Sequence, residues 1–169
     1  MGDRQVTSIT TRRLEIRPFP WSDVEALTAG QRAAGWAHDY PDEGDLVIAR
    51  ILHGQGRPDG REAPAPSGHH QIVERSSREV IGGIGIFGAP AGGTAEVGYG
   101  IVPSRRGRGY ASEALAALVA ALWGDPDLTA VVAYTELGNR SSQRVLEKAG
   151  FRHEVDLGDR RRYRLWRPS

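Results

Sequence analysis

A short basic segment at residues 103–111, Pro-Ser-Arg-Arg-Gly-Arg-Gly-Tyr-Ala, has the residue types of an anion-binding loop. It follows an apolar stretch at 95–102 that predicts a strand, and it precedes an amphipathic stretch at 111–123 that predicts a helix. Gly107 and Gly109 lack a Cβ, so the backbone can turn tightly and a ligand can approach its amides. The helix that begins there adds unpaired N–H groups and the positive end of its dipole.

Positive charge in this loop strengthens the prediction of an anion site, most naturally for a pyrophosphate. The charge comes from three side chains, Arg105, Arg106 and Arg108. A basic turn with an ordinary helix cap is the alternative interpretation of the same residues. A phosphate loop of the kinase type is not predicted, because the pattern G-x-x-x-x-G-K-[ST] occurs nowhere in the chain.

Glycine also recurs at 83–88, Gly-Ile-Gly-Ile-Phe-Gly, which fits the letter pattern G-x-G-x-x-G of dinucleotide sites. That motif requires a strand that leads directly into a helix. Here residues 89–93 read Ala-Pro-Ala-Gly-Gly and a further strand follows, so no helix begins at this point. We therefore interpret 83–88 as small residues in a closely packed strand.

Composition excludes several other classes of site. The chain has 169 residues, no cysteine and a formal net charge of +1. The absence of thiols excludes disulfides and metal–thiolate sites, and no metal is expected. The small net charge gives no general attraction to nucleic acid or to membranes. Because no signal peptide and no stretch of about 20 apolar residues is present, we expect a cytoplasmic protein with one domain over 1–169.

Periodicity along the chain predicts the elements that would position these segments. Strands are expected at 14–18, 71–75, 79–87, 95–102, 128–134, 151–155 and 161–167. Helices are expected after an N-cap at Ser22 or Asp23, near 44–52 with Leu46, Ala49, Ile51 and Leu52 buried, at 111–123 and at 139–149. Loops are expected at 54–70 and 88–93, which are rich in Gly and Pro. The order indicates an α+β domain around a central sheet.

Two separated motifs resemble signatures of the GNAT superfamily of N-acetyltransferases, nearest to its RimJ/RimL-like group. The first runs from Glu96 through the basic loop to Ala114. The second is Asn-Arg-Ser-Ser at 139–142 followed by Lys-Ala-Gly-Phe at 148–151, similar to N-x-x-S-x-x-x-x-x-K-x-G-F. The resemblance extends from about Ile9 to Trp166. It implies a single GNAT-like α+β domain, with a mixed sheet of about seven strands splayed between the fourth and fifth, and about four flanking helices.

The resemblance implies acetyl-CoA as cosubstrate and no metal. The pantetheine arm is expected in the splay, with the Val102 N–H on the thioester oxygen, and the pyrophosphate is expected on the amides of 105–110. The family's loop often begins with Gln or Arg where this chain has Ser104, so the resemblance implies no side-chain contact with the cofactor there. The expected cofactor-binding residues are Ile101, Val102, Arg105, Arg106, Gly107, Arg108, Gly109, Tyr110, Ala111, Asn139 and Ser142.

The reaction implied by the resemblance is direct attack of a neutral amine on the thioester. An alkylamine has a pKa near 10, so a base must remove its proton at neutral pH. Glu96 is the expected general base, acting through a water, and an ordinary surface glutamate on a strand is the alternative. Ser142 is expected to protonate or stabilise the leaving thiolate, and a serine that bonds only to local backbone is the alternative. Asn139 is expected to cap the helix that carries Ser142.

The acceptor is expected near the acidic and aromatic segment 35–43, where Trp36, Asp39 and Tyr40 would bind a cationic amine. A core position for Trp36 is the alternative. A protein N-terminus, an aminoglycoside-like antibiotic, a polyamine and an amino acid all stay open as acceptors, and so do a monomer and a homodimer.

Two functions of other classes compete with the enzyme. One is a non-catalytic acyl-CoA-binding or sensor domain on the same fold. The other is a nucleic-acid module that uses the basic loop and the arginines at 160–162. A solvated strand face explains those arginines adequately, so neither a nucleic-acid nor a membrane partner is expected.

Overall fold

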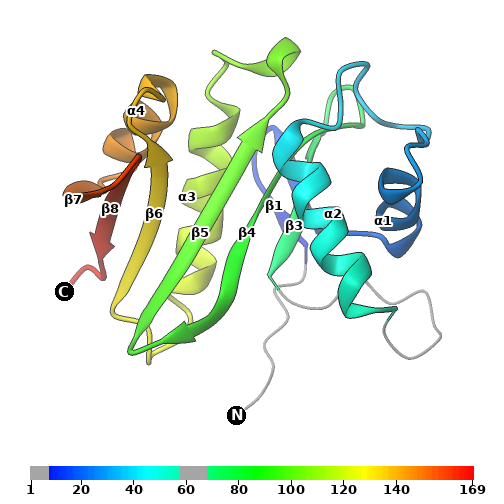
Figure 1. Cartoon of the computed structure of the whole chain (residues 1–169). Coiled ribbons are helices and arrows are strands. Elements are labelled where there is room, and N and C mark those ends of the chain that lie inside the picture. Colours follow the sequence, from blue (N-terminus) through cyan, green and yellow to red (C-terminus); the bar gives the residue numbers. More distant parts are fainter. Residues whose placement is uncertain (1–7, 58–67) are drawn as a thin grey trace.

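Eight strands form one mixed sheet in the computed structural model, which describes residues 8–57 and 68–169 (Figure 1). The strands are β1 (Ile9–Thr10), β2 (Leu14–Pro18), β3 (His69–Glu74), β4 (Glu79–Ala91), β5 (Thr94–Ile101), β6 (Ala130–Glu136), β7 (Arg152–Leu157) and β8 (Arg160–Trp166). Their order in the sheet is β1-β2-β3-β4-β5-β6-β8-β7. All neighbours are antiparallel except β5 and β6, which are parallel. The strand beyond the expected seven is the two-residue β1.

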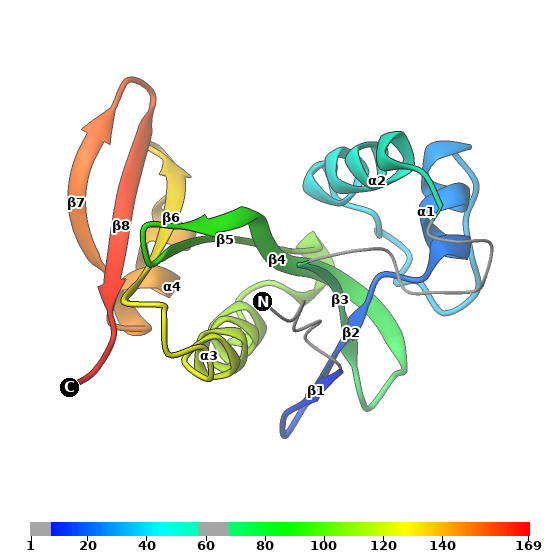
Figure 2. The ribbon, with the colours of Figure 1, turned by 90° about the horizontal axis from the view of Figure 1, so that it is seen from below.

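Helices cover both faces of this sheet (Figure 2). They are α1 (Trp21–Thr28), α2 (Glu43–Gln55), α3 (Tyr110–Leu122) and α4 (Arg140–Lys148), with a 3₁₀ turn η1 (Pro103–Arg105) before α3. One face carries α1 and α2, and the other carries α3 and α4. The predicted α+β domain with four helices is therefore confirmed. No helix in the described part of the chain is long and apolar enough to cross a bilayer.

The sheet opens between β5 and β6. The two strands pair from Thr94 with Ala130 as far as Val97 with Ala133. Beyond that point β5 continues to Ile101 and β6 to Glu136 without pairing to each other. This confirms the predicted splay, which lies between the fourth and fifth of the strands expected from the sequence.

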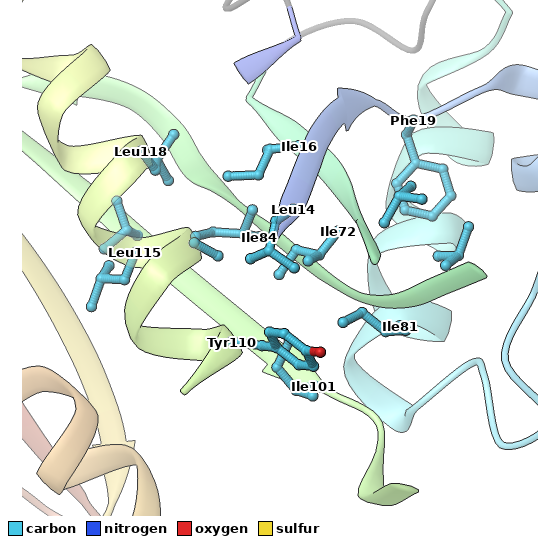
Figure 3. Close-up of a cluster of buried hydrophobic side chains, with 14 of the residues drawn as sticks. Leu14, Ile16, Phe19, Ile72, Ile81, Ile84, Ile101, Tyr110, Leu115 and Leu118 are labelled. Atoms are coloured by element: carbon cyan, nitrogen blue, oxygen red, sulfur yellow. The ribbon is translucent and has the colours of Figure 1, made fainter. Parts of the chain in front are cut away.

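The main core lies between α3 and the sheet (Figure 3). Leu115 and Leu118 of α3 are fully buried, as are Leu14 and Ile16 of β2. Their i, i+3 spacing on the helix and i, i+2 spacing on the strand place each pair on one face of its element. Complete burial of such side chains stabilises the fold by about 1.5–3 kcal/mol each. This core fixes the start of α3 against the β2–β3 side of the sheet.

Two predictions about the helices in the first half of the chain are wrong, one on where α1 begins and one on which side chains of α2 are buried. Helix α1 begins at Trp21, with Pro20 at the N-cap and no side-chain cap, rather than at Ser22 or Asp23. Proline suits a helix start because its missing N–H would have no helical partner there. On α2 the side chain of Ile51 is 42% exposed. The buried residues of α2 are spaced i, i+4, i+7 and are Asp45, Ala49 and Leu52.

Predicted loops around the sheet differ as well. Strand β4 continues to Ala91, which pairs with Thr94, so only a short turn stands where a loop over 88–93 was expected. Strand β3 begins at His69, inside the loop predicted for 54–70. Most of that loop prediction, and the N-terminal segment considered for a signal peptide, lies outside the described residues.

Candidate active site

The basic loop connects the open end of β5 to the start of α3, as its position in the sequence predicts. Gly107 and Gly109 have φ angles of +74° and +80°, a conformation that side chains with a Cβ rarely adopt. Gly109 is the N-cap of α3 and supplies no side-chain cap. The amides from Gly107 to Ala111 bond to no residue that the structure describes. They are therefore available to an anion at the positive end of the helix.

The first two arginines of the loop are occupied elsewhere. Their amides close the turn η1, with Arg105 N–H donating to the Val102 carbonyl (3.0 Å) and Arg106 N–H to that of Pro103 (3.2 Å). The Arg106 side chain donates to the Ile101 carbonyl (2.8 Å) and pairs with Asp42 (2.7 Å). The expected pyrophosphate contacts at residues 105 and 106 are thus corrected, because these amides already have acceptors.

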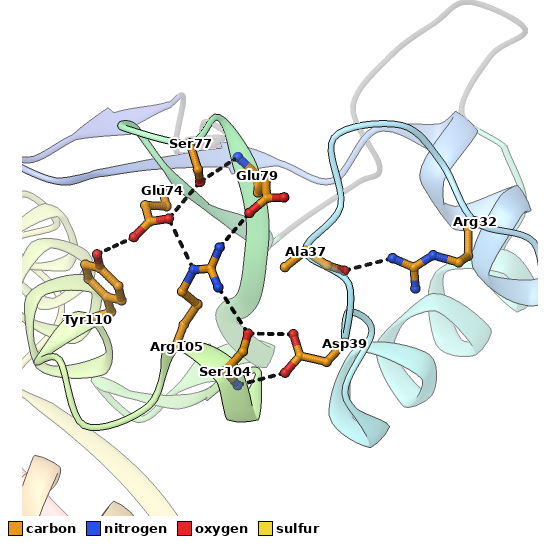
Figure 4. Close-up of polar contacts among 9 residues, drawn as sticks. All are labelled: Arg32, Ala37, Asp39, Glu74, Ser77, Glu79, Ser104, Arg105 and Tyr110. Carbon is orange, nitrogen blue, oxygen red and sulfur yellow. Dashed lines mark hydrogen bonds and ion pairs between the residues drawn. The ribbon is translucent and has the colours of Figure 1, made fainter.

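Arg105 belongs to a polar network that fastens the loop to the β3–β4 turn (Figure 4). Its guanidinium donates to Glu74 (3.2 Å) and to Glu79 (2.6 Å). Glu74 also accepts from the hydroxyl of Tyr110 and from Ser77 (2.7 Å). Burial alone would raise the pKa of Glu74, but the hydrogen bonds from Tyr110, Ser77 and Arg105 outweigh it and hold the pKa below its usual range.

The same network includes Asp39, one of the three residues predicted to bind the acceptor. Its carboxylate accepts from the Ser104 amide (2.7 Å) and the Ser104 hydroxyl (2.8 Å), and Ser104 in turn accepts from Arg105 (3.2 Å). Burial opposes ionisation of Asp39, but the Ser104 hydrogen bonds prevail and lower its pKa. Asp39 therefore holds the start of the basic loop through Ser104.

Trp36 and Tyr40 are core residues, which corrects their predicted role in acceptor binding. Their exposed fractions are 6% and 0%, and their rings pack edge to face at 5.1 Å. The indole N–H of Trp36 donates to Asp23 (2.9 Å), which also accepts from Gln71 (2.6 Å). Aromatic residues in a short connection between helices gave no signal that distinguished packing from ligand binding.

The unpaired edge of β5 faces the splay. Val102 N–H donates to the Ile81 carbonyl of β4 at 2.9 Å. Because donors alternate between the two sides of a strand, the amides of Tyr99 and Ile101 point to the other side, where pairing with β6 has ended. The expected role of the Val102 amide on the thioester oxygen is therefore corrected. Ile101 N–H is the donor that the register leaves free at that position.

Ser142 lies at the start of α4 and contacts Tyr99 across the splay. The Tyr99 hydroxyl is 2.9 Å from Ser142 Oγ and donates to the Ser142 carbonyl at 3.2 Å. Asn139 accepts from Ser142 N–H (3.0 Å), which confirms it as the N-cap of α4. Burial raises the pKa of Tyr99 to about 12, with the Ser142 contact opposing. Tyr99 thus stays protonated at neutral pH. It was not among the predicted site residues, because no local pattern marks it.

Glu96 lies earlier on β5, where the strand is paired on both sides, with Phe87 on β4 and Val132 on β6. Its side chain is half-buried. Alternation along the strand places it on the face opposite to the Tyr99 side chain. The structure therefore does not bring the Glu96 and Ser142 side chains together on one face of the sheet.

A cavity on the α2 face lies beside the open part of β5. It is lined by Phe19, Asp42, Gly44, Asp45, Ile48, His69, His70, Gly83, Ile84, Gly85, Phe87, Gly98, Tyr99 and Gly100. The glycines from 83 to 88 lie in β4, which confirms the closely packed strand. Among the described residues, no group of three or more His, Asp or Glu side chains is arranged to hold a metal ion.

Three curated relatives of the chain carry N-acetyltransferase names. Two Bacillus subtilis proteins, both described as uncharacterized N-acetyltransferases, are YjdG and YnaD. YjdG is 35% identical over 47% of this chain and 48% of its own length. YnaD is 28% identical over 86% of this chain and 83% of its own length. The match to YjdG thus spans about half of that relative.

Solved structures share the fold. An acetyltransferase of the GNAT family from Bacillus anthracis superposes with a TM-score of 0.69 at 21% identity, covering 95% of this chain and 98% of that one. RimL, a ribosomal L7/L12 α-N-protein acetyltransferase in complex with coenzyme A, superposes with a TM-score of 0.64 at 20% identity, covering 94% of this chain and 97% of that one.

The model of the acetyltransferase (GNAT) domain matches residues 13–152, which is most of the chain. This match covers both signature motifs, the splay between β5 and β6, and the loop before α3. The chain is therefore a member of the GNAT acetyltransferase family.

Proposed function

We propose that the protein transfers the acetyl group of acetyl-CoA to a primary amine by direct attack within a ternary complex. The observation that carries this proposal is a run of free main-chain donors. It extends from the unpaired edge of β5 to the amides of residues 107–111 at the start of α3. Acetyl-CoA has groups that match these donors in the same order, because its extended pantetheine arm contains amides that can bond to β5 and continues to a pyrophosphate that can bond to the loop. The proposed acceptor is a small-molecule amine or a peptide N-terminus.

The main chain of β5 would orient the thioester. The Tyr99 amide offers a donor to the pantetheine arm, and the Ile101 amide offers one to the thioester oxygen. A donor fixed in a rigid strand strengthens its hydrogen bond as negative charge develops on that oxygen. The backbone of Gly107 and Gly109, open because both residues have positive φ, would bind the pyrophosphate.

The contact between Ser142 and Tyr99 would supply the proton for the leaving thiolate. The hydroxyls are within hydrogen-bond distance of each other at 2.9 Å. Tyr99 holds its proton at neutral pH, because burial raises its pKa. Ser142 would donate its proton to the sulfur and take one from Tyr99, and Tyr99 would regain a proton from solvent. Glu96, whose side chain lies on the opposite face of the sheet, is the candidate base that the family resemblance suggests, and it would act through a water.

Calorimetric titration with acetyl-CoA tests the cofactor site, with Gly107→Glu as the disrupting variant. Gly158→Glu is the matched control, because Gly158 also has positive φ (+64°) and also leaves open space around a built Cβ, but lies in the β7–β8 turn. Both variants carry the same backbone strain and charge. We expect Gly107→Glu to abolish binding and Gly158→Glu to retain it. Equal binding by the two variants would remove the basis for placing the pyrophosphate at this loop.

Thiol release in the presence of primary amines then separates the enzyme from a domain that only binds acyl-CoA. We expect release that depends on the amine and falls in Ser142→Ala. Tight acetyl-CoA binding without release for any amine would favour the non-catalytic alternative.

A further inference from the structure

The cavity beside β5 has two glycines of β4, Gly83 and Gly85, in its lining. Its volume is about 120 Å³. A Cβ at Gly85 would collide with the main chain of Gly68 and His69, so glycine is required there. A Cβ at Gly83 would lie 2.6 Å from Asp45 Oδ1, so glycine lets the Asp45 carboxylate lie directly against the strand. Phe19, Ile48 and Phe87 supply the apolar part of the lining.

Asp45 carries a buried carboxylate in the first turn of α2. Its side chain leaves the residue only 6% exposed. Oδ2 accepts from the Asp42 amide (3.1 Å) and closes the capping box of α2. Oδ1 is the atom over Gly83. No Arg or Lys side chain of the described residues pairs with Asp45, and a buried charge without a partner is costly.

The electrostatics of the cavity suit a cationic amine. Burial raises the pKa of Asp45 to about 7, with the charge of Asp42 acting in the same direction and the Asp42 amide opposing. Burial and the neighbouring His70 lower the pKa of His69 to about 4, so His69 is neutral at pH 7 and does not repel an ammonium ion. The remaining titratable groups that face Asp45 or line the cavity are His70 of β3, Tyr40 before α2 and Tyr99 of β5.

We propose that Asp45 binds the acceptor ammonium group in this cavity and takes its proton before the amine attacks. The proposal rests on the acetyl-transfer function proposed above. The ammonium ion gives one proton to the Asp45 carboxylate, which later releases it to solvent. The neutral amine then forms the N–C bond as the C–S bond breaks. The second proton of the nitrogen passes to solvent, and solvent returns one proton to Tyr99, which restores the proton that the thiolate receives through Ser142.

Position favours Asp45 over Glu96 for this step. Asp45 lines the cavity together with Tyr99, and the Tyr99 hydroxyl reaches Ser142 on the other face. Tyr99 thus joins the acceptor cavity to the group proposed to protonate the thiolate. Glu96 does not line the cavity. The small volume and apolar walls select a slim primary amine such as an unbranched alkylamine.

Kinetics of Asp45→Asn with propylamine and glycinamide test the proposal. Asn keeps an oxygen for the Asp42 amide, and Glu43→Gln is the control, since it removes an exposed carboxylate from the same helical turn. We expect kcat/KM for the amine to fall roughly 100-fold in Asp45→Asn. Acetyl-CoA affinity and the Glu43→Gln rates should stay at the parent level. The rise of kcat/KM with pH through the Asp45 pKa of about 7 should vanish in Asp45→Asn.

An NMR titration tests the same group without turnover. In protein labelled with ¹³C at aspartate carboxyls, the Asp45 signal is identified by its absence in Asp45→Asn. Propylammonium chloride should lower the midpoint of its titration, because a bound cation favours the carboxylate, whereas propanol should not.

The outcomes separate this proposal from the function on which it rests. Full activity in Asp45→Asn, or a midpoint that propylammonium does not move, overturns the role of Asp45 while acetyl transfer stands. Loss of activity in Glu96→Gln with full activity in Asp45→Asn assigns the proton to Glu96. If the parent protein releases no thiol with either amine, the acetyl-transfer proposal fails for these acceptors, and the NMR titration alone decides whether Asp45 binds ammonium.

Discussion

The hydroxyls of Ser142 and Tyr99 form a pair whose value for catalysis can be measured by mutation. Ser142→Ala removes the proposed donor to the sulfur, and Tyr99→Phe removes its proton source while keeping the ring. We expect each change to lower kcat about tenfold or more, with little change in acetyl-CoA affinity. The double variant should lose little beyond the larger single loss, because both groups act on one proton. Additive losses in the double-mutant cycle would mean that the two hydroxyls act independently.

Asp45 makes the stability of the free protein depend on pH. Its folded pKa is about 7 against an ordinary value of 3.8, so the folded state holds the proton more tightly between these values. Stability therefore falls as pH rises from about 4 to 7, by at most ~1.4 kcal/mol per pH unit. Asn does not titrate and keeps the oxygen that accepts from Asp42. Asp45→Asn should consequently melt higher than the parent protein at pH 8, with the difference shrinking toward pH 4.5.

Thermal unfolding across this pH range provides the measurement, with exposed Glu43→Gln as the control. A difference between Asp45→Asn and the parent protein that stays constant from pH 4.5 to 8 would contradict a buried carboxylate of raised pKa. A saturating amine should remove part of the difference at pH 8, because the ammonium ion then balances the charge.

At the scale of elements, the basic loop before α3 depends on an anchor that lies far away in the sequence. Glu74 ends β3, yet it receives hydrogen bonds from Arg105 in the 3₁₀ turn and from Tyr110 at the start of α3. These contacts hold the loop against the β3–β4 turn. Burial of both Glu74 and Arg105 means that neither charge can be removed without leaving the other partly unpaired.

Glu74→Gln should therefore destabilise the protein and weaken acetyl-CoA binding together. We expect a loss of about 1–3 kcal/mol in unfolding free energy, measured by urea denaturation. Glu79→Gln is the comparison, because it also removes a partner of Arg105 but from a side chain that is 35% exposed. Its loss should stay within about 1 kcal/mol. Equal losses for the two variants would show that burial of Glu74 adds nothing.

At the scale of the whole molecule, the end of pairing between β5 and β6 places three parts of the site around one opening. The free β5 edge lies in it, the Ser142–Tyr99 pair spans it, and the Asp45 cavity lies on the face that carries α2. In the proposed mechanism, opposite faces of one sheet would serve the amine and the leaving thiolate. This arrangement would keep the two proposed proton transfers apart while joining both to a single strand.

The sequence by itself determined the features that depend on local chemistry. Gly107 and Gly109 mark the turn because few other residues adopt positive φ. Asn139 marks a helix start because its side chain satisfies a free amide three residues on. Apolar periodicity located every helix and all strands except β1, which has two residues and no period of its own. With the family motifs, these signals predicted the α+β fold and the position of the basic loop.

Tertiary structure alone decided which residues meet. From the sequence, Trp36 and Tyr40 suit a packing role and a ligand-binding role equally well. Only the tertiary structure shows that both are buried in the core. The register of β5 against β4 directs the Val102 amide to the Ile81 carbonyl and away from the splay, against the prediction. A shift of one residue in this register would direct every amide of β5 to the other side. Asp45 and the glycines of β4 are distant in sequence and join only when α2 packs on the sheet. Local patterns report the preferences of a segment, whereas burial and long-range pairing arise from the whole chain, so the Asp45 cavity had no sequence signature.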